Sequence, residues 1–249
     1  MQPYVAEFSG TALLILLGNG VVANVVLKQT KGHSGGWIVI TAGWALAVFT
    51  AVACVAPYSG AHLNPAVTVG LALAGSFGWS EVAPYVAAQL LGAVCGAGLV
   101  FAFYLPHYAA TDDPAAKLAT FATGPAIRSP VSNLFCEVVG TFVLVWAVLL
   151  ATKPGFHLAL DGGSPQHVPV GLGSLEALPV GLVVFAIGLS LGGTTGYAIN
   201  PARDLGPRIA HTLLPIPGKG DSDWGYAPIP VIGPLLGAAL AALASQAGK

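Results

Sequence analysis

Two copies of one tripeptide are the residues best suited to act on a small solute. Asn64-Pro65-Ala66 and Asn200-Pro201-Ala202 each open a short segment of the chain. Asparagine is a favoured helix N-cap, and proline is favoured at the first helical position. We therefore predict that each asparagine caps a short helix with its side-chain oxygen. The amide NH2 of each side chain then stays available to donate a hydrogen bond.

One arginine follows the second tripeptide directly. Arg203 stands three residues into the second segment, where Val67 holds the matching place in the first. A guanidinium supplies several donors and a permanent positive charge, so it can orient a hydroxyl group and repel cations. The alternative is that Arg203 extends to a lipid headgroup.

Three carboxylates are candidates for structural support. Asp204 precedes Arg208 by four residues, a spacing that favours an ion pair on one helix face. Glu7 and Glu137 stand inside apolar stretches, where an acid needs partners. We expect both to accept hydrogen bonds from the backbone amides of the tripeptide loops; the alternative is a proton relay.

The residues just before each tripeptide are expected to line the path of the solute. These residues are His62, Leu63, Ala198 and Ile199. For His62, contact with the solute and an ordinary hydrogen-bonded role both remain open.

Composition indicates that these residues are held inside a membrane. Of 249 residues, 55% are hydrophobic and 8% are charged, against about 25% charged in soluble domains; the mean hydropathy is +0.78. A net charge of -1 offers no basic patch for nucleic acid. The three cysteines lack metal-ligand spacing, so we expect no metal or cofactor, and we predict that they are buried as small apolar residues.

Six apolar stretches are long enough to cross a bilayer as helices, which takes about 20 residues. We place them at 4–27, 37–57, 81–105, 131–152, 178–195 and 227–245. The segments at 66–76 and 202–214 are too short, and their proline starts predict re-entrant half-helices. The stretches at 106–130 and 153–177 are expected to be solvent-facing connections with room for a short helix.

The two halves of the chain repeat each other. The segments 7–11, 64–66 and 90–93 recur in the same order at 137–141, 200–202 and 235–238. Three spans in each half force the halves into opposite orientations, which predicts an inverted repeat with its site near the membrane midplane. We therefore predict one all-α transmembrane channel domain over 1–249, with repeats at approximately 1–125 and 126–249. Inverted symmetry would point both half-helix N-termini, each with partial positive charge, at one central place.

The segments 59–68 and 196–204 resemble the two signature loops of the aquaporin family. The resemblance covers nearly the whole chain, and Asp204, Arg208 and Pro230 resemble the glycerol-facilitator branch. It implies a selectivity filter formed by Trp44, Gly188, Tyr197 and Arg203. Glycine at 188 implies a wider opening than in water channels, and tyrosine at 197 departs from the phenylalanine common in this branch.

The resemblance implies a passive channel for glycerol, water and other small uncharged solutes that excludes ions and protons. It also implies a homotetramer in the lipid bilayer and no enzymatic activity. A channel for neutral organic acids such as protonated lactic acid and an ion-coupled transporter remain the alternatives. Without any Asn-x-Ser/Thr acceptor, the chain fits a bacterial plasma membrane. The family topology has both termini in the cytoplasm, whereas the lysine distribution favours the opposite orientation.

Overall fold

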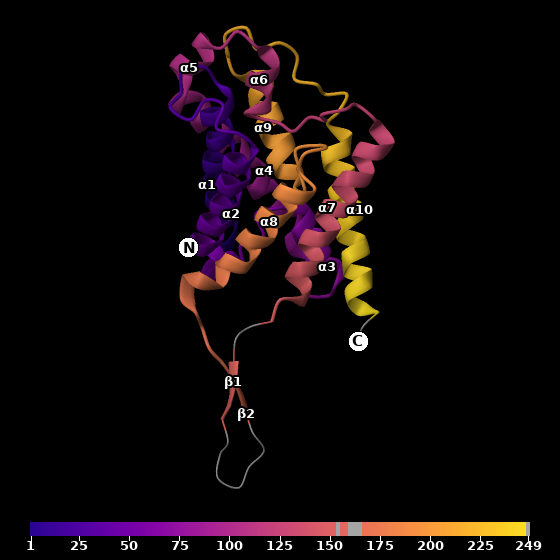
Figure 1. Ribbon diagram of the computed structural model, residues 1–249. Coiled ribbons are helices and arrows are strands. Elements are labelled where there is room, and N and C mark those ends of the chain that lie inside the picture. Colours follow the sequence, from indigo (N-terminus) through magenta and orange to yellow (C-terminus); the bar gives the residue numbers. More distant parts are fainter. Residues whose placement is uncertain (153–154, 159–165, 248–249) are drawn as a thin grey trace.

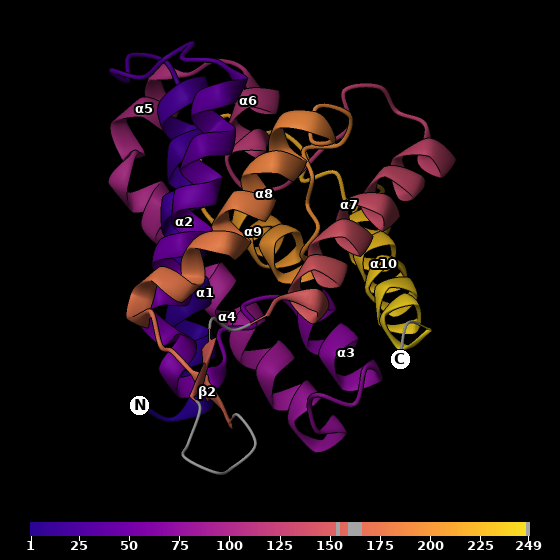
Figure 2. The same cartoon turned by 60° about the horizontal axis from the view of Figure 1, so that its bottom comes forward.

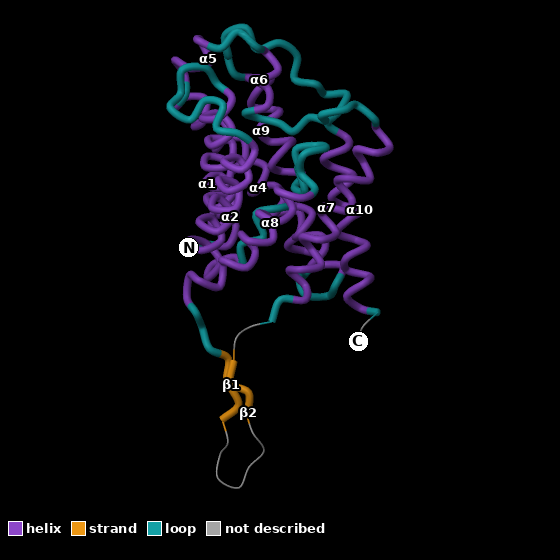
Figure 3. The backbone as a smooth tube through the Cα atoms, viewed as in Figure 1, coloured by secondary structure: helices purple, strands orange, loops and turns teal. Residues whose placement is uncertain are grey.

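The computed structural model describes residues 1–152, 155–158 and 166–247, and helices make up most of this part (Figures 1 and 3). The helices are α1 (Pro3–Val26), α2 (Trp37–Ser59), α3 (Pro65–Leu73), α4 (Trp79–Phe103), α5 (Leu105–Ala110), α6 (Pro114–Ala119), α7 (Pro130–Leu150), η1 (Gly173–Ala177), α8 (Leu178–Ser190), α9 (Pro201–Leu213) and α10 (Pro228–Gln246). Two strands, β1 (Gly155–Leu158) and β2 (Gln166–Pro169), form a hairpin.

Within the described residues, six helices are long and apolar enough to cross a membrane. They are α1, α2, α4, α7, the continuous run of η1 and α8, and α10. The predicted spans match their positions within a few residues, except the fifth. That span was expected to reach residue 195, but α8 ends at Ser190. The glycines that follow disfavour a helix, and Gly196 adopts a positive φ of 80°.

The two short segments form half-helices, as predicted. Helix α3 has 9 residues and α9 has 13, and each begins at the proline of its tripeptide. In Figure 1, α3 lies in the lower half of the bundle and α9 in the upper half; Figure 2 shows α9 among the surrounding helices. The half-helices therefore approach the middle of the protein from opposite ends.

Glycines let the spanning helices of each half pack closely. A Cβ built on Gly92 of α4 would lie 2.3 Å from the carbonyl oxygen of Phe8 on α1. A Cβ built on Gly237 of α10 would lie 2.3 Å from the carbonyl oxygen of Val138 on α7. The same backbone approach thus occurs at matching places in the two halves.

The connecting segments contain more structure than the sequence predicts. The stretch 106–130 holds α6 and most of α5, in line with the short helix allowed for there. The stretch 153–177 holds the short helix η1 and, unexpectedly, the antiparallel hairpin, in which Gly155 pairs with Pro169. Figure 1 shows the hairpin projecting from the end of the bundle that carries both termini.

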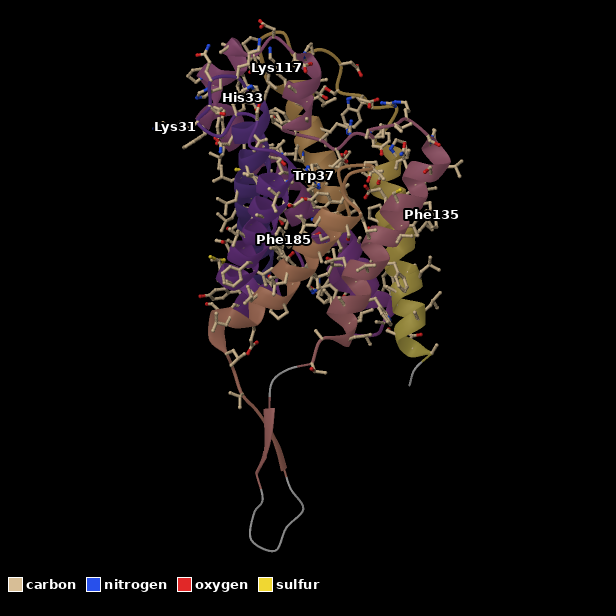
Figure 4. All side chains as sticks on the ribbon, viewed as in Figure 1. Lys31, His33, Trp37, Lys117, Phe135 and Phe185 are labelled. Carbon is tan, nitrogen blue, oxygen red and sulfur yellow. The ribbon has the colours of Figure 1, made fainter. Side chains whose placement is uncertain are left out.

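The outside of the bundle is apolar. Phe135 of α7 is 67% exposed and points away from the bundle in Figure 4. The prediction that the three cysteines are buried was wrong, because Cys54 and Cys95 are exposed and Cys136 is only partly buried. Apolar residues of a spanning helix can face lipid, so an apolar setting does not imply burial in protein.

The lysines opposite the termini have local partners. Figure 4 shows Lys31 and Lys117 at that end. Lys28 pairs with Asp112 at 2.6 Å, and Lys117 donates to the carbonyl of Pro217. Lys219 donates to three carbonyls at the end of α9 at 2.7–2.8 Å, where a cation is favoured. Most of the lysines that favour the opposite membrane orientation thus have structural contacts.

Candidate functional site

A cavity of about 180 Å³ lies where the two half-helices meet. Residues predicted for the site that line it are Trp44, His62, Leu63, Asn64, Tyr197, Ala198, Ile199, Asn200 and Arg203. Apolar residues from the spanning helices complete the wall, among them Leu14, Val48, Val52, Val180 and Val184. The cavity therefore combines polar groups from the two loops with an extensive apolar wall.

The two asparagines cap their own half-helices and also reach across to the other half. Oδ1 of Asn64 accepts from Ala66 N at 2.8 Å, and Oδ1 of Asn200 accepts from Ala202 N at 3.0 Å. Nδ2 of Asn64 donates to the carbonyl of Ile199 at 2.8 Å. Nδ2 of Asn200 donates to the carbonyl of Leu63 at 2.9 Å. One N–H of each amide is thus used, and the second forms no hydrogen bond to the described residues.

The prolines and alanines of the tripeptides have a different position. Pro65, Ala66, Pro201 and Ala202 are buried in the first turns of α3 and α9. Their side chains do not line the cavity. They set the starts of the half-helices, while the asparagines contact the cavity.

The buried Glu7 carboxylate holds the first loop. Its Oε1 accepts from Ser59 Oγ at 2.6 Å and from His62 N at 2.9 Å. Its Oε2 accepts from Leu63 N at 2.7 Å and from Gln89 Nε2 at 2.7 Å. The backbone amides before Asn64 are therefore turned toward the carboxylate.

Glu137 makes the same contacts to the second loop. Its Oε1 accepts from Thr195 Oγ1 at 2.7 Å and from Ala198 N at 3.0 Å. Its Oε2 accepts from Ile199 N at 2.9 Å. Both glutamates thus occupy the positions that a scaffolding role requires.

These contacts hold a strained backbone. Ala61 and Leu63 each have φ of 51°, and Tyr197 and Ile199 have φ of 38° and 43°. The left-handed region costs a residue other than glycine on the order of 1–3 kcal/mol. Leu63 and Ile199 supply both a carbonyl to an asparagine and an amide to a glutamate. The strain is therefore offset by hydrogen bonds on both sides of the same residue.

Arg203 is buried at the edge of the cavity, and three partners fix its position. Its guanidinium carbon lies 4.2 Å from the centroid of the Trp44 ring, a cation–π distance. Its Nη1 donates to the carbonyl of Phe121 at 3.1 Å. Nη1 also donates to Oδ1 of Asn19 at 3.4 Å, whereas Nε and Nη2 form no direct hydrogen bond to the described residues.

Tyr197, in the loop before Asn200, lies beside Gly188 of α8. A Cβ built on Gly188 would lie 3.0 Å from Cζ of Tyr197, so glycine makes room for this ring. Gly188 is not among the residues found to line the cavity; its carbonyl accepts from Trp37 Nε1 at 2.9 Å. The Tyr197 hydroxyl is buried and has no hydrogen-bond partner in the described part of the chain. The phenol thus brings an unused polar atom beside the site.

His62 lines the cavity and has an ordinary hydrogen bond as well. Its Nδ1 lies 3.1 Å from Thr68 Oγ1, and its ring packs against Phe77 and Tyr85 at centroid distances of 4.6 and 5.0 Å. Both interpretations of His62 therefore have a structural counterpart.

Asp204 and Arg208 form a fully buried ion pair, with Oδ1 2.8 Å from Nε. Oδ2 of Asp204 also accepts from the backbone amide and the hydroxyl of Thr123, each at 2.7 Å. Arg208 donates in turn to the Thr123 carbonyl at 3.0 Å. The ion pair therefore fixes the segment that follows Phe121. The carbonyl of Phe121 in turn accepts a hydrogen bond from Arg203.

The sequence model of the major intrinsic protein family matches residues 1–245. The chain belongs to this family. The resemblance of its signature loops is thereby confirmed, as is the predicted fold of six spanning helices with two half-helices.

Relatives within the major intrinsic protein family are similar over almost their full length. A probable glycerol uptake facilitator protein of Thermotoga maritima is 57% identical, over 97% of each chain. A glycerol uptake facilitator protein of Streptococcus pneumoniae is 55% identical, over 98% of this chain and 97% of the relative. The X-ray structure of the aquaglyceroporin from Plasmodium falciparum superposes with a TM-score of 0.80 at 31% identity, covering 97% and 93% of the chains. This member of the family is a multi-pass integral protein of the plasma membrane.

Two side chains of this major intrinsic protein were missed in the sequence. Asn19 of α1 donates to the Phe121 carbonyl at 3.1 Å, and its Oδ1 lies 3.4 Å from Nη1 of Arg203. Gln89 of α4 donates to both Glu7 and Thr68. An amide inside an apolar span is a signal that could have found both. The Phe121 carbonyl gives no such signal, because any residue supplies one.

Proposed function

We propose that this protein is a passive channel for glycerol, water and other small uncharged solutes, and that it excludes ions and protons. The observation that carries the proposal is the two-sided cavity. The Asn64, Asn200 and Arg203 side chains offer donors, while Val48, Val52 and other apolar residues form the rest of the wall. A polyol has hydroxyls along one side of its carbon chain and C–H groups along the other, so it suits such a cavity. The names of the bacterial relatives and of the structural neighbour support glycerol.

Charge exclusion follows from the groups that point at the cavity. Asn64 and Asn200 cap helices whose positive N-terminal ends meet at one place. Arg203 adds a permanent positive charge beside it. A cation or a hydrated proton approaching this place meets repulsion that a neutral solute does not.

Conduction in this proposal needs no covalent chemistry and no coupled ion. Every hydrogen bond described for the Glu7 and Glu137 side chains comes from a donor that also fixes a loop or a neighbouring helix. That pattern favours a scaffold over a proton relay. The matching contacts of the two carboxylates also support our division of the chain into inverted repeats at approximately 1–125 and 126–249. We further propose that the channel works as a homotetramer, as its family resemblance implies.

Protonated lactic acid is the second candidate solute. The observation that favours it is the unpartnered Tyr197 hydroxyl, which can donate to or accept from a carboxylic acid group.

Stopped-flow light scattering on proteoliposomes separates these proposals. Glycerol, water and lactic acid are compared across a pH series, with protein-free liposomes as the background. Fast glycerol entry that depends on neither pH nor an ion gradient is the expected result. Fast water with negligible glycerol would contradict the glycerol proposal. Entry of lactic acid alone, near or below its pKa, would favour the second candidate, and a requirement for an ion gradient would overturn passive conduction.

A further inference from the structure

Gly18 of α1 lies directly against the face of the Trp44 indole. A Cβ built on Gly18 would lie 2.3 Å from Cζ3, 2.4 Å from Cε3 and 2.5 Å from Cη2 of that ring. Three consecutive ring atoms at nearly equal distances place this Cβ over the ring face, because an approach in the ring plane would leave the outer two much farther away. Real Cβ atoms essentially never show contacts under 3.0 Å. The indole therefore occupies the space that any side chain at position 18 would need.

The Trp44 ring stands between Gly18 and the cavity. Trp44 lines the cavity. Gly18 is buried, and it is not one of the described residues that line the cavity. The Arg203 guanidinium lies over the same indole. A ring displaced from position 18 consequently moves toward the cavity or the guanidinium, and either movement narrows the passage.

We propose that Gly18 is a specificity-determining residue of the channel, although it does not touch the solute. Its missing side chain sets how far the Trp44 indole stands back, and so the width available to the carbon backbone of a polyol. This inference rests on the proposed conduction of glycerol. The width of the filter then depends partly on α1, although Gly18 of that helix does not line the pore.

The expected effect is selective because the two solutes differ in width. Side chains in a densely packed protein yield little, so an added methyl group is transmitted to the ring that it touches. Glycerol fills more of the passage than a water molecule does, and a small inward shift hinders glycerol more. We expect Gly18→Ala to lower the ratio of glycerol to water permeability about tenfold, which is a barrier difference of about 1.4 kcal/mol.

The matched control is Gly20→Ala, two residues along the same helix. A Cβ built on Gly20 meets nothing within 4 Å. Both variants and the wild type are reconstituted at equal protein density, and glycerol and water permeabilities are measured on the same vesicles. The proposal expects an unchanged ratio for Gly20→Ala and a fall for Gly18→Ala. An unchanged ratio for a conducting Gly18→Ala channel would overturn it.

A second pair of variants tests whether Trp44 transmits the effect. Phenylalanine at 44 removes part of the indole and leaves room for the methyl group. In the Trp44→Phe background we expect Gly18→Ala to change the ratio less than about twofold, whereas an undiminished tenfold fall would refute transmission through Trp44. If Gly18→Ala alone does not fold, folding of the Gly18→Ala/Trp44→Phe double variant supports the contact, and failure of both overturns it. Glycerol conduction by the wild type is measured separately, so a failure of the proposed function is recognised on its own.

Discussion

Replacing Glu137 by glutamine should disturb the second signature loop more than its small chemical change suggests. The carboxylate accepts three hydrogen bonds, two on Oε1 and one on Oε2. Glutamine has one acceptor oxygen. With that oxygen in the Oε1 position, Thr195 and Ala198 keep their partner, and the NH2 group faces the amide of Ile199.

The cost follows from these contacts. A buried N–H that loses its acceptor costs about 1–3 kcal/mol, and the two remaining bonds lose the advantage of a charged acceptor, about 1 kcal/mol each. The sum of about 3–5 kcal/mol exceeds the strain of about 1–3 kcal/mol that Ile199 holds at φ 43°. We therefore expect Ile199 to leave the left-handed region or the protein to lose stability by this amount.

Thermal unfolding in detergent and glycerol permeability in proteoliposomes provide the assay. At about 2–4 °C per kcal/mol for a chain of this size, the apparent Tm should fall by about 6–20 °C, and glycerol permeability should fall with it. Glu81→Gln is the control, because Glu81 contacts Tyr4 in an exposed setting. Equal Tm and permeability in the two variants would refute the scaffolding role of Glu137.

Three further changes have outcomes that the contacts fix. Asp204→Asn leaves Arg208 charged and fully buried without its partner, so we expect a loss of about 3–5 kcal/mol, read as a lower apparent Tm; an unchanged Tm would count against the pair. Gly237→Ala should lower the yield of folded protein in size-exclusion chromatography, since its methyl group meets backbone, whereas Gly98→Ala meets nothing within 4 Å and should match the wild type. Arg203→Val should admit cations or protons, measured as dissipation of an imposed gradient; unaltered selectivity would exclude Arg203 from the filter.

Much of the fold could be predicted because a bilayer leaves few solutions for a chain. Every spanning segment must satisfy its own backbone, so length and apolarity identify the helices. The half-helices could be predicted because an asparagine and a proline at the start of a short apolar segment have one clear structural use. The two loops could be predicted because the Asn-Pro-Ala tripeptide and the glutamate before it, Glu7 or Glu137, occur in both halves of the chain.

The parts that could not be predicted depend on contacts between distant residues. The fifth span ends early where Gly192 leaves room for the Tyr197 ring, since a Cβ on Gly192 would lie 2.3 Å from Cδ1 of that ring. The hairpin of β1 and β2 has strands of four residues, too short for a reliable pattern. The Phe121 carbonyl reaches Arg203 because Asn19 binds the same carbonyl and the Asp204–Arg208 pair holds Thr123, two residues further on.

The reciprocal bonds of the two asparagines have a consequence for biosynthesis. Asn200 donates to Leu63, a residue 137 positions earlier. Translation at about 5–20 residues per second separates the two by about 7–27 s. During that interval the first loop sits in the membrane with an asparagine amide and a carbonyl that lack their final partners. A nascent chain released before residue 200 therefore carries half a site and no pore, and co-expression of the two halves as separate polypeptides should be able to restore both.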